Sequence, residues 1–237
     1  MKALLLAAGK GTRISRYLNG RPKCTVDIGN GVMLINYTID LLRKKGIDEI
    51  AVVTGYQHKV IEEILENSGV KLYYSPFFDV TNSIVSAWFA KDFLDDDMII
   101  MNADVFCEEK IYDEILKLNS NPLMIYDSSR IKEADYKFYC PDNKILKYGK
   151  DLSEKETTGE YVGIAKLKRD FMPIFKERLN DMVCNQEHGV WWENVLYSMS
   201  DAMDIYAHDV SSMFWAEVDY IEDYERIRTY VKNGNVR

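Results

Sequence analysis

The first 23 residues of the chain constrain its fold and function more than any other stretch. A short apolar run, residues 2–8, leads into a loop that contains Gly9 and Gly11. Such a run suits a buried parallel strand, and the glycines let the backbone approach a ligand closely. Backbone N–H groups in a turn of this kind form an anion-binding concavity, and Arg13 and Lys23 place positive charges beside it. The stretch therefore predicts a polyphosphate cradle at the carboxyl end of the first strand.

Two common phosphate-binding motifs do not account for this loop. The pair Gly9-x-Gly11 lacks the third glycine of the Rossmann fingerprint. The Gly-Lys-Ser/Thr end of the P-loop is also missing from the sequence. An ordinary strand-to-loop turn with solvated cations is the alternative. The complete string, with Pro22 directly before the second cation, favours the cradle.

The string from Leu6 to Arg13, followed by Pro22-Lys23, resembles the signature of nucleotidyltransferases with a GT-A-like fold. That family includes sugar-1-phosphate nucleotidylyltransferases and phosphocholine cytidylyltransferases, and the resemblance runs along the whole chain. It implies that the loop holds the triphosphate of a nucleotide and that Lys23 and Arg13 act on the reacting phosphates. The positions that it assigns to nucleotide binding are Leu6, Ala8, Gly9, Lys10, Gly11, Thr12, Gly55 and Asn82. The alternative for Asn82 is a purely structural role as a helix cap.

The remaining chain alternates apolar strands with amphipathic helices, which predicts a parallel sheet covered on both faces. Helices are expected at 33–45, 58–67, 83–93, 110–118, 170–182 and 221–231, and strands at 49–54, 70–74, 97–101, 122–126, 160–167, 204–206 and 214–220. The polar stretch 127–160 contains a hairpin pattern at 137–148 and predicts a small inserted β flap. We therefore expect one α/β domain over 1–237, a three-layer α/β/α fold with a mostly parallel central sheet, Rossmann-like as in GT-A nucleotidyltransferases.

Composition excludes several other classes of protein. The apolar content of 47% can fill one core, and no stretch reaches the roughly 20 apolar residues of a membrane span. The net charge of −8 argues against a general nucleic-acid binder. Four scattered cysteines without metal-ligand spacing are expected to be free thiols in the cytoplasm, and no signal peptide is expected. The oligomeric state stays open, with a homodimer as one option.

Two carboxylates are the candidate metal ligands. Asp104 follows the strand expected at 97–101, where a carboxylate facing a phosphate cradle is well placed to hold Mg²⁺. The family commonly has an acidic residue at the position of Asn102 as well, so only Asp104 is carried over. The resemblance places a second ligand at the late turn, where Asp219 fits better than Glu217. The alternatives are a turn aspartate for Asp104 and a helix cap for Asp219.

The segment Trp191-Trp192-Glu193 is the candidate acceptor site. Two indole rings beside a carboxylate can enclose a cation, as in sites for quaternary ammonium groups. Adjacent helical residues point about 100° apart, so one of the two tryptophans is expected in the core. The resemblance adds Glu160, in a segment near the acceptor.

These residues, together with the resemblance, predict a Mg²⁺-dependent cytidylyltransferase. It would transfer CMP from CTP to phosphocholine or another amino-bearing phosphate or phosphonate, with release of pyrophosphate. CTP is expected from the overall resemblance to the short cytidylyltransferases. A sugar-1-phosphate nucleotidylyltransferase that uses CTP or UTP is the enzymatic alternative, and a nucleotide-sensing module is the non-enzymatic one.

Overall fold

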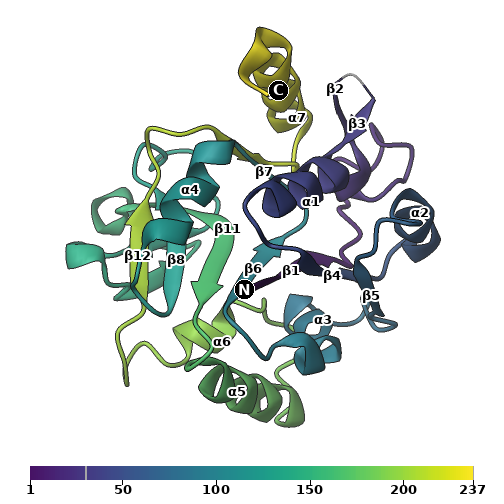
Figure 1. Ribbon diagram of the computed structural model, residues 1–237. Coiled ribbons are helices and arrows are strands. Elements are labelled where there is room, and N and C mark those ends of the chain that lie inside the picture. The colour runs from purple at the N-terminus through teal and green to yellow at the C-terminus, as the bar shows by residue number, and fades with distance from the viewer. Residues whose placement is uncertain (30, 237) are drawn as a thin grey trace.

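The computed structural model describes residues 1–29 and 31–236 of the chain. Its centre is a nine-stranded sheet, in which β1 (Lys2–Ala7) lies between β4 (Glu49–Thr54) and β6 (Met98–Asn102) (Figure 1). Both neighbours run parallel to β1, and β5 (Lys71–Tyr74) extends the parallel set beyond β4. Residues 3–7 of β1 are apolar on both faces, which suits a strand covered by helices on both sides of the sheet.

The other half of the sheet is mostly antiparallel. β11 (Gly159–Leu167) pairs antiparallel with β6 and with β8 (Leu123–Asp127). β12 (Tyr206–Asp209) then adds a parallel edge to β8. The expected flap hairpin is present, because β9 (Lys137–Tyr139) pairs antiparallel with β10 (Lys147–Gly149) beside β11.

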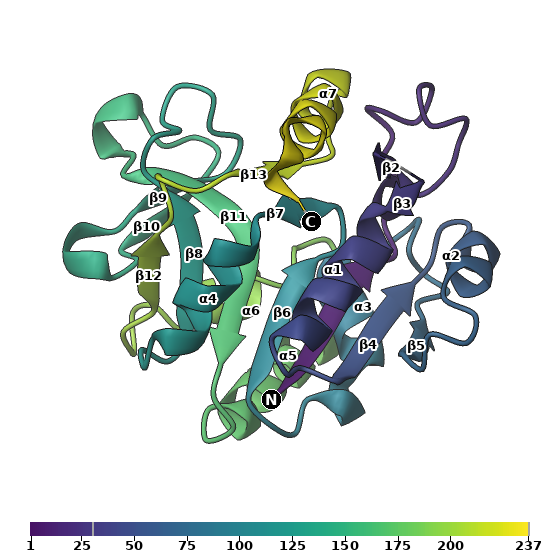
Figure 2. The same ribbon diagram turned by 45° about the horizontal axis from the view of Figure 1, so that its top comes forward.

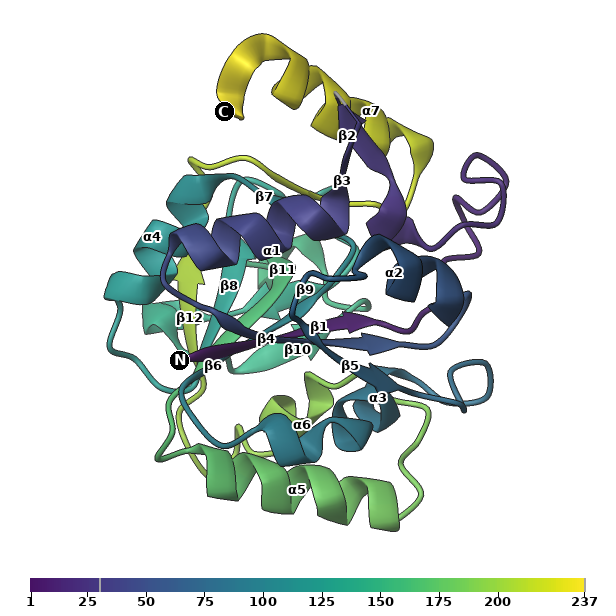
Figure 3. The same cartoon turned by 45° about the vertical axis from the view of Figure 1, so that its right-hand side comes forward.

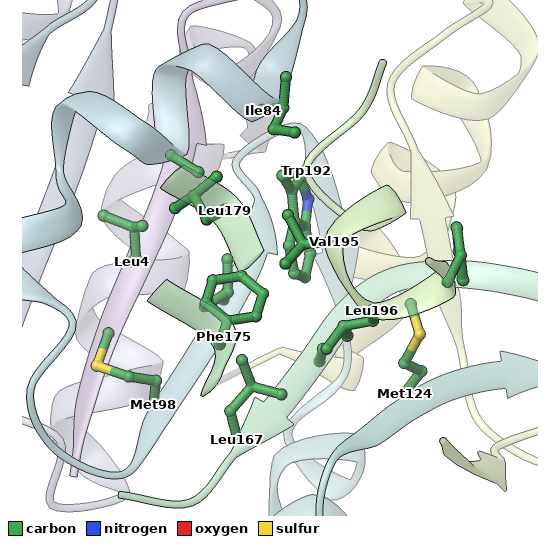
Figure 4. Close-up of a cluster of buried hydrophobic side chains, with 14 of the residues drawn as sticks. Leu4, Ile84, Met98, Met124, Leu167, Phe175, Leu179, Trp192, Val195 and Leu196 are labelled. Atoms are coloured by element: carbon green, nitrogen blue, oxygen red, sulfur yellow. The ribbon is translucent and has the colours of Figure 1, made fainter. Parts of the chain in front are cut away.

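Helices cover the two faces of the sheet in the expected three layers (Figure 3). One apolar cluster joins alternate residues of β1, such as Leu5, to the helices α1 (Leu34–Lys44), α2 (His58–Ile64) and α4 (Glu109–Lys117). The opposite cluster joins Leu4 to α3 (Ser83–Phe89), α5 (Met172–Cys184) and α6 (Asn194–Tyr197). Figure 4 shows the second cluster, with Leu4, Ile84, Phe175 and Trp192 among the labelled side chains.

Two short pairings outside the main sheet shape the site. β7 (Val105–Cys107) pairs antiparallel with β13 (Trp215–Glu217), and the two strands lie side by side in Figure 2. β2 (Asp27–Gly29) pairs with β3 (Val32–Met33). The final helix, α7 (Ile221–Tyr230), packs over this region through a third apolar cluster. The remaining turns are 3₁₀ segments at Lys23–Thr25, Lys91–Phe93, Pro141–Asn143 and Glu154–Glu156, and a π-helical turn at Val231–Asn235.

The main differences from the expected elements lie at ends and in short strands. The helix expected over 83–93 ends at Phe89 and continues as a 3₁₀ turn, and the strand expected at 204–206 lies at Tyr206–Asp209. Strands β2, β3 and β7 have two or three residues each and show no alternation long enough to predict. Over residues 1–29 and 31–236, no helix is both long enough and apolar enough to cross a membrane.

Candidate active site

A cleft opens at the carboxyl edge of the central strands, as expected for a parallel sheet. It has two lobes, with cavity volumes of about 210 Å³ and about 330 Å³. The first lobe lies over the loop that follows β1, and the second lies under the flap. The residues that line both lobes are Gly11, Lys23, Asn102, Trp191 and Glu217. These shared residues mark a junction at which a ligand in one lobe would meet a ligand in the other.

The first lobe contains most of the residues that the sequence assigned to nucleotide binding. Its lining includes Leu6, Ala8, Gly9, Gly11 and Asn82. Asn82 also caps α3, because its side-chain oxygen accepts a hydrogen bond from the backbone N–H of Ser83 at 2.8 Å. The capping interpretation is therefore confirmed, and the same side chain still borders the lobe.

Two of the assigned residues, Gly55 and Lys10, line neither lobe of the cleft. A Cβ atom on Gly55 would lie 2.7 Å from the carbonyl oxygen of Ala8, and the N–H of Tyr56 donates to that oxygen at 3.0 Å. Gly55 thus supports the loop from behind and lines neither lobe. Lys10 is exposed, with its ammonium 5.9 Å from the centre of the Tyr56 ring. Their assignment to nucleotide binding stays a prediction.

Lys23 is held at the junction by carboxylates from two distant elements. Its ammonium donates to Asp104 at 3.1 Å and to Asp219, which also pairs with Arg13. Burial alone would lower the pKa of Lys23, but the charges of Asp104, Asp219 and Glu217 raise it well above its ordinary value. Burial would likewise raise the pKa of Asp219, but the Lys23 and Arg13 charges hold it below its usual range. Both ion-pair partners are therefore charged at neutral pH.

Three carboxylates form a cluster that suits a divalent cation. Oxygen atoms of Asp104, Glu217 and Asp219 all lie within 4.8 Å of one another. The β7–β13 pairing brings them together, because Glu217 lies opposite Val105 and the N–H of Val218 donates to the Asp104 carbonyl at 2.9 Å. Burial, followed by the charges of Asp104 and Asp219, raises the pKa of Glu217 well above its usual value. A set of three carboxyl groups fits Mg²⁺, which prefers oxygen ligands.

The sequence reasoning set Glu217 aside in favour of Asp219, whereas the structure brings both into the cluster. A usable signal was present. Residues two apart along a strand point to the same face, so the pattern Glu217-x-Asp219 at the end of a strand indicates two carboxylates on one side.

The expected cage of two tryptophans is corrected by the structure. Trp191 is 41% exposed and lines both lobes, but Trp192 is fully buried and lines neither. The Trp192 backbone N–H donates to the Ser83 hydroxyl at 2.9 Å, and its indole N–H donates to Asn102 at 3.1 Å. The segment before α6 is not helical, and its bonds to the start of α3 turn one ring inward and the other outward. One tryptophan in the core was expected, and it is Trp192 (Figure 4).

Tyrosines replace the missing indole in the second lobe. Tyr136, Tyr161 and Tyr197 line it, and the rings of Tyr136 and Tyr197 stack with centres 5.7 Å apart. The sequence reasoning missed all three because they lie on separate elements of the chain. Glu193 lines the same lobe, and burial raises its pKa to about 7.

Glu160 lines the second lobe as expected, but both of its carboxylate oxygens are already engaged. One accepts from Arg130 at 2.5 Å and the other accepts from the backbone N–H of Asp135 at 2.7 Å. Burial raises the pKa of Glu160 despite these two donors. The predicted loop residues Thr12 and Arg13 also border this lobe instead of the first.

A parallel sheet with a glycine-containing loop after its first strand, facing a cluster of carboxylates and a lysine, defines a nucleotidyltransferase type of α/β domain. Residues 3–128 match the family model of the MobA-like NTP transferase domain, and the chain belongs to this family of enzymes. The resemblance inferred from the stretch between Leu6 and Lys23 is thereby confirmed.

Similar proteins cover nearly the whole chain. It is 27% identical to CTP:phosphoglutamine cytidylyltransferase of Campylobacter jejuni, over 95% of this chain and 98% of that protein. It is 24% identical to choline-phosphate cytidylyltransferase of Streptococcus pneumoniae, over 99% of this chain and 100% of that protein. The solved structure of CTP:phosphocholine cytidylyltransferase from Streptococcus pneumoniae superimposes with a TM-score of 0.80 at 21% identity, covering 97% of this chain and 98% of that one. The inositol-1-phosphate CTP transferase of T. maritima superimposes with a TM-score of 0.78 at 17% identity, covering 100% and 98%. These superpositions confirm the predicted fold.

Proposed function

We propose that this protein transfers a cytidylyl group from CTP to a small acceptor that carries a phosphate or phosphonate and an amino group, releasing pyrophosphate. The proposal rests on the position of Lys23, whose ammonium donates to Asp104 and Asp219 at the junction of the two lobes. One lobe lies over the glycine-containing loop and the other contains aromatic and acidic side chains. Names of similar proteins support CTP as the nucleotide and a phosphorylated small molecule as the acceptor.

The proposed reaction needs alignment and charge neutralisation more than proton transfer. An oxygen of the acceptor phosphate forms a bond to the α-phosphorus of CTP, while the bond from that phosphorus to the bridging oxygen breaks and pyrophosphate leaves. A phosphate monoester is largely ionised near pH 7, so the nucleophile requires no general base. Holding both substrates at one junction supplies the proximity that such a reaction needs.

The glycine-containing loop and the charged residues at the junction each have a proposed task. Gly9 and Gly11 let the backbone N–H groups of the loop approach the triphosphate. Lys23 neutralises the acceptor phosphate or the α-phosphate, and Arg13 neutralises the leaving pyrophosphate. Asp104 and Asp219, with Glu217, would hold Mg²⁺, which when bound supplies further positive charge to the phosphates.

A pyrophosphate-release assay tests this proposal. It combines CTP, UTP, ATP or GTP with phosphocholine, phosphoethanolamine, 2-aminoethylphosphonate or glucose-1-phosphate in the presence of Mg²⁺. Turnover with CTP and an amino-bearing acceptor is expected. Turnover with glucose-1-phosphate alone would favour a sugar-1-phosphate nucleotidylyltransferase, and CTP binding without turnover would favour a nucleotide-sensing module.

Lys23→Met tests the assigned chemistry. The substitution removes the charge at the junction but keeps an unbranched chain, so we expect turnover to fall at least about a hundredfold. Lys59→Met, at an exposed position on α2, is the matched control and should keep full turnover. Circular dichroism verifies that both variants are folded. Wild-type turnover in a folded Lys23→Met variant would refute the proposed role.

A further inference from the structure

Three buried oxygen atoms in the second lobe have no hydrogen-bond partner. Over the described part of the chain, five buried side-chain oxygens lack one: those of Tyr73, Tyr161, Glu193, Asn194 and Tyr197. Three of their side chains, Tyr161, Glu193 and Tyr197, line the same cavity of about 330 Å³. Each of these three residues is at least nine-tenths buried. Leaving a buried polar atom unpaired costs free energy, so their convergence on one cavity points to a ligand that pairs with them.

The protein's own cations are already used elsewhere in this lobe. Among the described residues, the cationic side chains that line it are Arg13, Lys23 and Lys150. Arg13 and Lys23 pair with Asp219, and Lys150 donates to both oxygens of Asp135, at 2.9 and 2.8 Å. Arg130, close by, is paired with Glu160. The buried carboxyl of Glu193 therefore faces a cavity in which the nearby cations have other partners.

We propose that the acceptor ends in a primary ammonium group, which binds Glu193 and the hydroxyls of Tyr161 and Tyr197. This inference rests on the proposed function and narrows its acceptor. A primary ammonium has three N–H donors and one positive charge, which match two phenol oxygens and one carboxylate oxygen. Hydrogen bonds to charged groups are also the stronger kind.

A quaternary ammonium group fits this oxygen set less well. Trimethylammonium has no N–H donor, so it would cover the three oxygens with methyl groups and leave them unpaired. The four aromatic rings that line the lobe, those of Tyr136, Tyr161, Trp191 and Tyr197, would attract such a cation, but they give no donor to the three oxygens. A sugar hydroxyl could bond to the tyrosines but would bring no charge to Glu193. The primary ammonium satisfies both requirements.

A methylation series of one acceptor tests the inference. Phosphoethanolamine and its N-methyl, N,N-dimethyl and N,N,N-trimethyl derivatives differ only in the number of N–H donors. With CTP and Mg²⁺, we expect kcat/KM to fall along the series and to be at least about tenfold lower for the trimethyl compound, phosphocholine. Equal or better use of phosphocholine would overturn this inference and leave the proposed function standing. If neither this series nor 2-aminoethylphosphonate releases pyrophosphate with CTP, the proposed function fails and the inference fails with it.

Substitutions in the second lobe identify which side-chain atoms bind the ammonium group of the acceptor. Tyr161→Phe and Tyr197→Phe each remove one hydroxyl, and Glu193→Gln removes the charge. Each should lower the preference for phosphoethanolamine over phosphocholine several-fold, a ratio that a general loss of activity would not change. Tyr73→Phe is the matched control, because its buried hydroxyl is also unpartnered but lies outside both lobes. An unchanged ratio in all three lobe variants would overturn the assignment.

Discussion

Replacing Glu193 by glutamine should raise the free energy of unfolding at high pH relative to the wild type. The Glu193 side chain is buried, and its pKa rises from 4.5 to about 7 in the folded protein. Between these two values the folded protein holds a proton that the unfolded chain has released. The free energy of unfolding therefore falls as the pH rises through this range, because ionising the buried carboxyl is unfavourable.

The size of the effect follows from the two pKa values. At about 1.4 kcal/mol per pKa unit, ionising Glu193 in the folded protein costs about 3 kcal/mol at pH 8. About 2.5 kcal/mol of this cost arises between pH 5 and pH 8. The glutamine side chain of the variant has the same shape and stays neutral throughout. The variant should therefore gain about 2.5 kcal/mol relative to the wild type over this interval.

Urea unfolding followed by circular dichroism at pH 5, 6.5 and 8 measures the difference between the two proteins. Glu63→Gln, an exposed position on α2, is the control and should show no pH-dependent difference. A difference between Glu193→Gln and wild type that stays constant from pH 5 to pH 8 would refute the reasoning. It would mean that the carboxyl ionises as easily in the second lobe as in water.

Three further substitutions test other parts of the site. Gly11→Ala should lower turnover and cost roughly 1 kcal/mol of stability, since the new Cβ would lie 2.6 Å from Lys23 Cγ and the backbone has a φ of +58°. Gly9→Ala is the control, because a Cβ there meets open space, and it should keep the wild-type stability in urea unfolding. Asp219→Asn should raise the Mg²⁺ concentration for half-maximal pyrophosphate release at least about tenfold, because it removes the charge of one carboxylate proposed to hold the ion. Trp192→Phe should cost roughly 1–3 kcal/mol in thermal unfolding, because it leaves a gap in the core and removes an indole hydrogen bond.

The parallel half of the fold was predictable because its pattern is local. Residues 49–54 are an apolar run and residues 34–44 have a helical apolar stripe, and each fits the same layer whatever the rest of the chain does. The glycine-containing loop was equally local, since its two glycines and its cations lie within 23 residues. Five of the eight residues assigned to nucleotide binding line the first lobe: Leu6, Ala8, Gly9, Gly11 and Asn82.

The second lobe depends on contacts between distant segments, which no local pattern specifies. Tyr136, Tyr161 and Tyr197 come from the flap, a sheet strand and a short helix, and they meet only in the folded chain. The orientation of Trp191 and its neighbour follows from hydrogen bonds between the segment 188–192 and the start of α3. Helical spacing could not predict that orientation, because those residues are not in a helix.

The order of charges along the cleft gives the proposed acceptor a direction. Glu193 lines only the second lobe, Lys23 lines both lobes at their junction, and Asp104 and Asp219 hold Lys23. An acceptor with an ammonium at one end and a phosphate at the other matches this order in one orientation only, with its ammonium toward Glu193. The phosphate then faces Lys23 and the first lobe, where the α-phosphate of CTP is proposed to lie. The buried carboxyl that destabilises the free protein at neutral pH would therefore orient the nucleophile, and binding of the ammonium would offset part of that cost.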